Sequence, residues 1–594
     1  MRLLRDVRGN TLAIMTAALI PLAGLVGGGI DVSRMYILKT RLQHACDAGA
    51  LAGRKAMGGG TWSYNNYYAR AQANQFFDGN IRSGIFSSTD MTREFTENAG
   101  RVVGTASATI PMTLMRIFGK MTDTLSVTCD AEMRLPNTDV MFVLDTTGSM
   151  GDTPAGDSMS KLASLKISVK CFYEIVARLD TDASCTTGTP SGGTGSQVQI
   201  RFGFVPYATN VNVGKLLSPD WIADTANYQT RSVESVSWSN WELVDYYTAS
   251  RYDTCKPAPA NTSTREYRVL GPTRTYNGYT YSSWYCIYEA RDYNNVTWTY
   301  NSLPVTTSLL KNGSGFNSNF QWPIGSGGAN VTINWDGCVE ERQTVSQASY
   351  TPVPSGAKDL DIDSIPSTSD ATTQWKPVLP DLIYTRSNGS GWTTNAVSST
   401  SDMRRDYYYA CPREAKKLQS WPDANAFDTY VDGLYSEGNT YHDIGLIWGA
   451  RLMSPTGLFA SENAFTPQGG EIERHMIFMT DGDACTGVNN YTAYGVNWFD
   501  RRTTGAASAP TEGCTSTGTL TQQVNARTEA LCTVIKNKNI TLWVITFGYV
   551  DPTTVTRMTA CASSGRYFSA NNAAQLQSTF KSIADQISQL RLTR

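Results

Sequence analysis

The chain has 594 residues, which exceeds one ordinary domain and predicts two or three. Only 17% of the residues are charged, the formal net charge is -2 and no basic stripe is visible, which excludes a typical nucleic-acid-binding protein. A composition rich in Ser, Thr, Asn and Gly, with 11% aromatic residues, is typical of an exported protein.

The 12 cysteines indicate the compartment in which the chain folds. None forms a C-x-x-C motif and only three histidines exist, so a zinc or iron–sulfur site has little support. An even number of scattered cysteines favours disulfides in an oxidising compartment over buried free thiols. The candidates for pairing are Cys46, Cys129, Cys171, Cys185, Cys255, Cys286, Cys338, Cys411, Cys485, Cys514, Cys532 and Cys561.

The segment Thr11–Ile30 has 20 residues and no charge, which is long enough to cross a bilayer. A cleaved signal peptide has a shorter apolar core with a small-x-small site just beyond it, so the segment predicts a permanent anchor. Basic residues flank it on both sides and do not orient it. Because the cysteines require an oxidising environment, we expect a cytoplasmic N-terminus and a periplasmic bulk.

A helix is expected to continue from Thr11 to Met57, because small and apolar residues recur at three- and four-residue steps. This stripe consists of Met35, Leu38, Leu42, Ala45, Gly49 and Ala52. One interpretation is an anchor followed by a stalk, and the other is a pilin-like stem that packs beside other such stems.

The first resemblance lies here. Arg8-Gly9 before the span, the Gly-rich exit into Asp31 and the run Leu42–Ala52 resemble the TadE/TadG-like proteins of Flp (tight-adherence) pilus assembly. The resemblance implies pilin-like or Tad components as partners, in the bacterial inner membrane. Processed pseudopilins of this kind carry Glu five residues after the cleavage glycine, whereas Ile14 stands there after Gly9, which argues against cleavage.

Residues 58–136 predict a small strand-containing, pilin-like module that follows the stem of residues 1–57. Arg101–Ile110 and Leu125–Met133 have the pattern of strands, and a Cys46–Cys129 disulfide would tie the helix to them. The end of this module is expected after Pro136.

A second domain is predicted over residues 137–594. Its first strand is the apolar run Val140–Leu144, which ends in Asp145 and is followed by Thr147 and Ser149. One carboxylate and two hydroxyls are hard oxygen donors that suit Mg²⁺, and parallel α/β sheets place ligand sites at such strand ends. The alternative is a polar turn in which Asp145 caps a helix.

The next elements predict an α/β layer with a large interruption. A helix over Lys161–Leu179 is followed by a strand over Val198–Val205, which Pro206 is expected to end. Residues 215–421 predict a β-rich, disulfide-bearing insertion with an Asn277-Gly278 hairpin turn. Its aromatic residues either pack the insertion, which is favoured, or form a contact surface for sugars or proteins.

The α/β pattern then returns. A helix is expected over Asp443–Met453, and the strand Met476–Met479 ends in Thr480-Asp481-Gly482. A strand over Ile540–Phe547 and a closing helix over Ala573–Leu592 follow.

These pieces resemble the von Willebrand factor A domain and its metal-ion-dependent adhesion site. The resemblance implies a doubly wound, Rossmann-like sheet and a divalent cation, Mg²⁺ in first place with Ca²⁺ or Mn²⁺ as alternatives. One coordination position would accept water or an acidic group of a protein or surface ligand. The implied ligands are Asp145, Thr147, Ser149, Thr440 and Asp481, with Thr147 in place of the usual Ser.

Several neighbours of this site have expected supporting roles. Asp483 is expected to support the site rather than bind the ion, and His442 and Asp443 to orient the Thr440 loop or cap its helix. Three further disulfides are plausible, and the sequence does not decide their connectivity: Cys485–Cys514, Cys532–Cys561 and Cys171–Cys185.

The combined pattern resembles the TadG type of Flp pilus-assembly protein and leaves two functions open. The first is a minor pilin-like or tip-associated protein that binds partner pilins or a surface through its metal site, with the cell surface at the pilus tip as its location. The second is an inner-membrane-anchored periplasmic scaffold without metal-dependent adhesion. Catalysis is not expected. Ser158-x-x-Lys161 matches the short S-x-x-K motif of serine acyl enzymes, but the sequence lacks the K-T-G motif that accompanies it in those enzymes.

Overall fold

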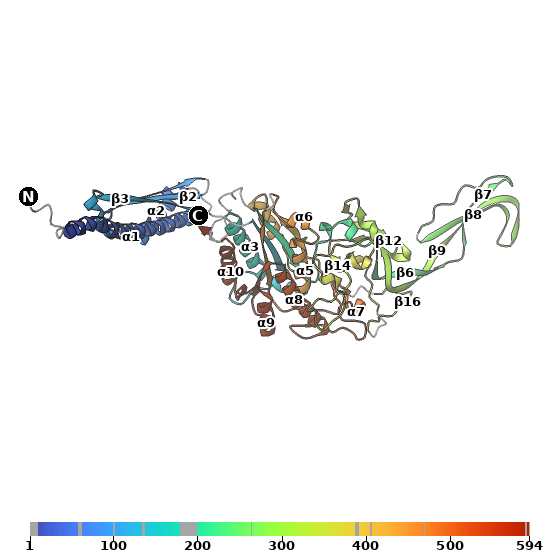
Figure 1. The fold of residues 1–594 in the computed structure, drawn as a ribbon. Coiled ribbons are helices and arrows are strands. Elements are labelled where there is room, and N and C mark those ends of the chain that lie inside the picture. Colours follow the sequence, from blue (N-terminus) through green and yellow to red (C-terminus); the bar gives the residue numbers. More distant parts are fainter. Residues whose placement is uncertain are drawn as a thin grey trace, which may run out of the picture. The chain divides into compact units, whose positions relative to one another are not determined.

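The chain forms two compact units, which Figure 1 shows as ribbons. The first contains Met1–Pro136, Ile167–Gln199 and Gln577–Arg594, and the second contains Asn137–Lys166 and Ile200–Leu576. The computed structural model describes residues 10–57, 62–98, 101–132, 137–178, 199–262, 264–386, 391–403, 407–467, 470–588 and 591–592.

The first unit combines a long helix with an antiparallel sheet. Helix α1 (Asn10–Met57) agrees with the predicted 11–57 helix, and α2 (Tyr64–Asn80) packs beside it. The sheet has the order β1-β2-β3-β25, and its strands are β1 (Thr89–Asn98), β2 (Arg101–Pro111), β3 (Thr122–Glu132) and β25 (Arg591–Leu592). Strands β2 and β3 were predicted, whereas α2 and β1 were not.

The small-residue stripe of α1 is used within this unit. Leu38, Leu42 and Ala45 are fully buried in a core that also contains residues of β2 and β3. A disulfide joins Cys46 of α1 to Cys129 of β3, as the sequence suggested. This part of α1 therefore covers its own sheet, and the stem-packing interpretation does not apply to the stripe.

The C-terminal end differs from the expected helix over Ala573–Leu592. Helix α10 (Ala573–Ile587) ends five residues earlier, and Arg591–Leu592 pairs with β3 as an edge strand. The apolar period of the sequence does not show that the edge of β3 is available to pair with Arg591–Leu592.

The second unit is built on a mixed six-stranded sheet of order β17-β5-β4-β18-β23-β24. All neighbouring pairs are parallel except β17 with β5. The strands are β4 (Asn137–Asp145), β5 (Ile200–Tyr207), β17 (Lys416–Gln419), β18 (Ile472–Thr480), β23 (Ile540–Phe547) and β24 (Tyr567–Ala570). Its helices are α4 (Ala424–Asp432), α5 (His442–Met453), α6 (Ala460–Asn463), α7 (Asn497–Asp500), α8 (Thr519–Asn537) and α9 (Pro552–Cys561), and α3 (Lys161–Arg178) begins in this unit and continues into the first.

Two details of this sheet correct the sequence-based expectation. Strand β5 runs through Pro206, because β17 pairs only with Phe202 and Phe204, so no hydrogen bond to β17 requires the missing N–H of Pro206. Strand β17 lies within the range assigned to the insertion, so that range contains an edge strand of the main sheet.

Helices cover both faces of the sheet. On one face, Phe427 of α4 packs against Phe202 and Phe204 of β5, with ring centroids 5.7 and 5.3 Å apart. On the other, α5 approaches closely because it has glycines: a Cβ on Gly449 would lie 2.4 Å from Val143 of β4. The near-continuous apolar strands are therefore buried, as parallel sheets require.

The insertion is β-rich, as predicted. Its five-stranded sheet centres on β9 (Tyr279–Thr306), which pairs with β6 (Thr225–Trp238), β7 (Glu242–Ala249), β8 (Arg265–Tyr276) and β16 (Val397–Ser399). The β8–β9 hairpin turns at Asn277-Gly278, where both residues have the positive φ of a type I′ turn. Short pairs complete the unit: β10 (Lys311–Asn312) with β11 (Gly315–Phe316), β12 (Asn319–Trp322) with β13 (Val331–Asn334), β14 (Val339–Glu340) with β15 (Lys376–Pro377), β19 (Cys485–Thr486) with β22 (Gly513–Cys514), and β20 (Tyr491–Thr492) with β21 (Gly495–Val496).

The aromatic residues of the insertion divide into two groups. Most of those in its body are buried or partly buried, as the favoured interpretation expected, and the largest fully buried ones are Tyr300, Trp335, Tyr350 and Trp375. Strands β7, β8 and part of β9 extend as an arm (Figure 1), on which Tyr246, Tyr252 and Tyr279 are exposed.

Buried charges join the insertion to the helices of the α/β layer. Arg527 of α8 contacts Asp443 of α5 at 2.8 Å and also pairs with Asp359 of the insertion. Arg451 of α5 pairs with Glu341 at 2.8 Å. The side chains of these residues are at most 1% exposed, so each carboxylate relies on its guanidinium for neutralisation.

Disulfides also connect segments of the second unit. Cys485–Cys514 and Cys532–Cys561 form as suggested, and Cys255–Cys286 and Cys338–Cys411 connect parts of the insertion. The suggested Cys171–Cys185 pair includes Cys185, which lies outside the described residues. The disulfides support the expected oxidising compartment.

Candidate functional site

The strand order distinguishes the carboxyl ends of β4 and β18 from the other strand ends of the sheet. From β4 the chain passes to β5 on one side, and it later returns through β18 to the other side of β4. The crevice between β4 and β18 is therefore the topological switch point, where α/β sheets bind ligands outside the carboxyl ends of their strands. Asp145 ends β4, and Asp481 directly follows β18.

Three loops meet at this crevice. The turn after β4 hydrogen-bonds to the loop before α5 through Gly148 N to Gly438 O and Glu437 N to Thr146 O, both at 2.9 Å. The same loop continues to Thr440, whose backbone exchanges two hydrogen bonds of 3.1 Å with Cys485 in the loop after β18. The predicted convergence of distant segments is thus present in the backbone.

Asp145 is fully buried and held by three donors. Its Oδ1 accepts from Thr147 N at 2.9 Å, and its Oδ2 accepts from the Thr480 hydroxyl at 2.9 Å and from the Tyr207 hydroxyl at 3.3 Å. Burial, together with the charge of Asp481, raises the pKa of Asp145 to about 7. Among the described residues, the three donors to Asp145 are a backbone N–H and two hydroxyls, and none of them carries a positive charge.

Asp481 has a different set of partners. Its Oδ1 accepts from the Ser149 hydroxyl at 2.9 Å, and its Oδ2 accepts from Lys161 Nζ at 2.9 Å. The Thr147 and Ser149 hydroxyls lie 3.1 Å apart, so a chain of oxygens extends from Asp481 to the β4 turn. The Asp481 side chain is 0% exposed and that of Lys161 is 15% exposed, so this ion pair is largely shielded from water.

Lys161 is a residue of this candidate site that the sequence interpretation missed. It is the first residue of α3, where a cation faces the positive end of the helix dipole and no acidic residue compensates it. This unfavourable placement was the available signal, because it points to a carboxylate outside the helix. Lys161 had been considered only as part of an S-x-x-K motif.

The supporting residues only partly match their expected roles. His442 Nε2 lies 2.9 Å from the Thr480 hydroxyl, and burial lowers the pKa of His442 to about 3, so the ring is neutral at physiological pH. Asp443 instead pairs with Arg527. The Asp483 Oδ1 atom is buried and has no hydrogen-bond partner among the described residues.

The donor atoms of the candidate site are oxygens, which suit a hard cation. Two carboxylates and two hydroxyls are linked at Asp145, Thr147, Ser149 and Asp481, and oxygen donors of this kind suit Mg²⁺. In the described part of the chain, no hydrogen bond links the hydroxyl of Thr440, the fifth predicted ligand, to these four. Among the same residues, no group of three or more His, Cys, Asp or Glu side chains is placed to hold a metal ion.

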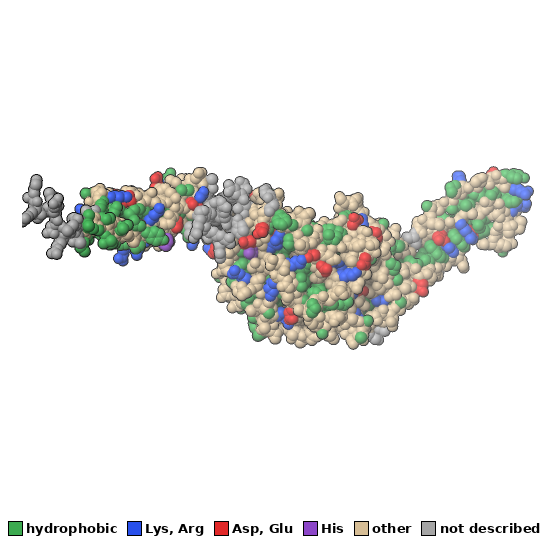
Figure 2. Space-filling model, viewed as in Figure 1, with side chains coloured by type: hydrophobic (Ala, Val, Ile, Leu, Met, Phe, Trp, Pro, Cys, Tyr) green, Lys and Arg blue, Asp and Glu red, His purple; other side chains and the backbone are tan. Residues whose placement is uncertain are grey.

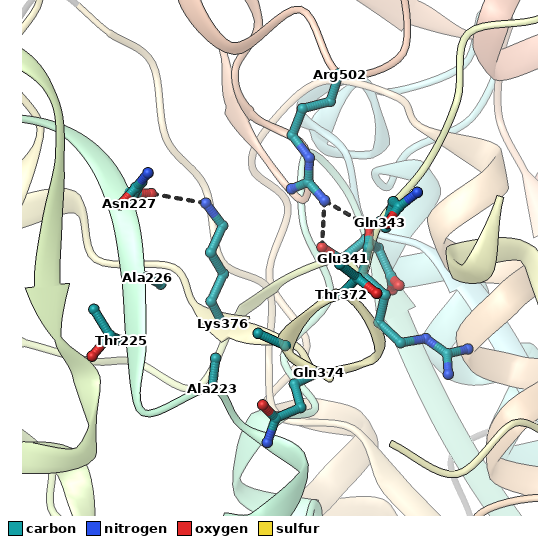
Figure 3. Close-up of a pocket in the computed structure, with 12 residues that line it drawn as sticks. Ala223, Thr225, Ala226, Asn227, Glu341, Gln343, Thr372, Gln374, Lys376 and Arg502 are labelled. Atoms are coloured by element: carbon teal, nitrogen blue, oxygen red, sulfur yellow. Dashed lines mark hydrogen bonds between the residues drawn. The ribbon is translucent and has the colours of Figure 1, made fainter. Parts of the chain in front are cut away.

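The described part of the second unit contains cavities both beside this site and away from it. One of about 460 Å³ borders Asn439, next to Thr440, and the Cys485–Cys514 disulfide. The other, of about 380 Å³, is shown in Figure 3, with Lys376 bonded to the Asn227 carbonyl at 2.9 Å and Arg502 bonded to the Glu341 carbonyl at 2.5 Å. Lys376 and Arg502 also pair with the buried Glu340, at 2.7 and 3.3 Å, so the cations of this cavity are partly neutralised.

Comparison with known proteins matches one region of the chain to a described family. Residues 9–73 match the family described as "Putative Flp pilus-assembly TadE/G-like", which supports a component of Tad pilus assembly. Together with α1, the one described helix that is long and apolar enough to span a membrane, this match supports a membrane-anchored protein. No curated protein matches the chain.

Similarity to solved structures is weak. Proximal thread matrix protein 1 from the mussel byssus is 12% identical over 31% of this chain and 35% of that chain, with a TM-score of 0.18. A second crystal form of the same protein gives 14% identity, 30% and 35% coverage, and a TM-score of 0.18.

Proposed function

We propose that the chain is a non-enzymatic, membrane-anchored component of a Flp/Tad pilus-assembly system whose second unit is a von Willebrand A-like head. In this proposal the head holds a divalent cation, Mg²⁺ before Ca²⁺ or Mn²⁺, through Asp145, Thr147, Ser149 and Asp481, with Thr440 as a fifth ligand. The cation would supply an electrophilic centre for a carboxylate of a partner pilin or of a surface.

One observation carries this proposal: two buried carboxylates face one crevice from adjacent parallel strands. Asp145 and Asp481 sit at the switch point, and the Ser149 hydroxyl bridges toward both strand ends. Two like charges in a shielded crevice are unfavourable without a cation, and the single ammonium of Lys161 balances only one of them. A divalent ion would balance both.

Lys161 also favours a second candidate function. Because its ammonium already neutralises Asp481, the head can fold around this crevice without a metal. The chain would then be a periplasmic scaffold of the pilus machine, anchored by α1, with its insertion as the contact surface. This candidate predicts no metal-dependent binding.

The test uses the full-length chain in lipid nanodiscs and measures Mg²⁺ and Mn²⁺ binding by calorimetry. Asp145→Asn and Asp481→Asn should each abolish binding, because each removes one of the two charges. Asp152→Asn is the matched control, since Asp152 is an exposed acid just beyond the same turn. Equal binding by the wild type and both charge-removing variants would reject the metal site.

A separate experiment distinguishes the two functions. Pili sheared from cells should carry an adhesin, whereas a scaffold should remain with the membrane fraction. An adhesin should also lose surface binding in Asp145→Asn cells that still assemble pili, and unchanged adhesion would favour the scaffold.

A further inference from the structure

The turn that joins β2 to β3 exposes an apolar cluster beside α1. Ile117 is 73% exposed, Met121 is 61% exposed and Phe118 is 47% exposed. Two basic residues, Arg116 and Lys120, lie among them. A cluster of large apolar side chains rimmed by charge marks an interaction surface rather than an ordinary polar turn.

The turn lies against the most apolar part of α1. A Cβ on Gly24 would be 3.2 Å from the Phe118 ring, and a Cβ on Gly27 would be 2.5 Å from Cβ of Leu114. The glycines of α1 therefore allow the turn to contact the helix backbone within Thr11–Ile30, the segment expected to cross the bilayer. Figure 2 shows hydrophobic side chains gathered over this end of the first unit.

The backbone of the turn is adapted to an apolar environment. The Asp31 carboxylate accepts from Thr113 N at 2.8 Å, Leu114 N at 3.0 Å and Met115 N at 2.9 Å. Further N–H groups bond within the turn, for example Ile117 N to Leu114 O at 3.1 Å. Most of its donors are thus satisfied internally, which hydrocarbon requires of any backbone that enters it.

The depth of the turn follows from the helix rise. Gly24 precedes Asp31 by seven residues, which corresponds to about 10 Å along α1. Around this level α1 is exposed on more than one side, through Leu19, Leu22, Leu25 and Val26. A helix that is apolar all round fits lipid, whereas a docking site for one protein needs only one apolar face.

We infer that residues Leu114–Met121 form a second membrane contact, inserted into the leaflet on the side of the folded units. Ile117, Phe118 and Met121 enter the acyl region beside α1. Arg116 reaches lipid phosphates, as long basic side chains do at an interface, and the exposed Lys120–Asp123 ion pair of 3.0 Å lies beside it. This inference rests on α1 spanning the membrane and is independent of the metal site. The contact would fix the first unit against the membrane surface instead of leaving it on a free stalk.

The experiment places a nitroxide spin label at Ile117→Cys in the full-length chain, at one molecule per nanodisc of phosphatidylethanolamine and phosphatidylglycerol. No described cysteine is free, so the new thiol can be labelled selectively. Oxygen, which concentrates in lipid, should relax this label more than a water-soluble nickel complex does. Thr96→Cys on the exposed side of β1 is the control, and there the nickel complex should dominate.

Met121→Cys provides a second position and guards against disturbance by the first label. Both positions should report a lipid depth, and circular dichroism should show an unchanged fold. Nickel accessibility equal to that of Thr96 at both positions would overturn the inference. Protection that develops only when a second copy or a pilin is added would also overturn it, in favour of a protein contact.

Discussion

Replacing Lys161 by Met tests whether the crevice between β4 and β18 is a cation site. The change removes the ammonium that lies 2.9 Å from Asp481 Oδ2 and leaves a fully buried carboxylate with only the Ser149 hydroxyl. Breaking a buried ion pair by removing one partner costs about 3 to 5 kcal/mol, and the 15% exposure of the Lys161 side chain places the expected loss at about 3 kcal/mol.

The metal should offset much of this loss. With Lys161 absent, a divalent ion meets two unneutralised carboxylates and no competing ammonium, so its affinity should rise. At a Mg²⁺ concentration of 100 times the Kd, binding stabilises the folded state by about 2.7 kcal/mol. The variant should therefore be markedly less stable than the wild type in EDTA and nearly as stable in excess Mg²⁺.

The assay is urea denaturation of the full-length chain, followed by tryptophan fluorescence, with EDTA or with Mg²⁺. Lys166→Met is the matched control on the same helix, because Lys166 Nζ bonds the Asp432 carbonyl at 2.8 Å at an exposed position. It should change the stability by less than about 1 kcal/mol in either buffer. A Lys161→Met loss of equal size with and without Mg²⁺ would refute the reasoning and favour a purely structural ion pair.

Three further outcomes are expected from urea denaturation. Arg527→Met leaves two buried aspartates unpaired and should cost about 3 to 5 kcal/mol, whereas Lys417→Met, in an exposed pair, should cost less than about 1 kcal/mol; equal losses would contradict the burial argument. Burial and the charge of Arg566 lower the pKa of His475 from 6.5 to about 4, so only the unfolded state binds this proton between these pH values. The free energy of unfolding should therefore fall by about 3 kcal/mol as pH drops from 6.5 to 4. His475→Gln should remove this pH-dependent loss, and a variant with the same pH profile as the wild type would show that His475 does not cause it. Gly49→Ala places a Cβ 2.4 Å from the Phe95 ring and should destabilise by about 1 to 3 kcal/mol, while Gly79→Ala in open space should be neutral or stabilising; the reverse order would show that the first unit packs differently.

Local patterns in the sequence predicted the elements whose own residues define their type and their ends. The apolar run that ends at Asp145, the strand Ile540–Phe547 and the helix that ends at Met57 each have a strong period and a clear boundary. The Asn277-Gly278 turn was predictable for the same reason, since few residue pairs adopt two positive φ angles.

Other elements were missed because a distant partner defines them. The edge strand β17 forms only because β5 offers a free edge to it, and Arg591–Leu592 is a strand only because β3 lies beside it. The strand end expected at Pro206 and the helix expected to continue to Leu592 were wrong for the same reason: a hydrogen-bond partner, or the lack of one, is a property of the neighbouring strand.

The candidate site shows the same division. Residue type after the first apolar strand suggested Asp145, Thr147 and Ser149 as oxygen donors for a cation, and the resemblance to the von Willebrand factor A domain implied Thr440 and Asp481 as further ligands. The strand order brings Asp145 and Asp481 together at the switch point, and only the tertiary structure reveals that Lys161 reaches Asp481 from the start of α3. A side chain's chemistry is a local property that the sequence states directly, whereas its electrostatic partner depends on how segments hundreds of residues apart are packed.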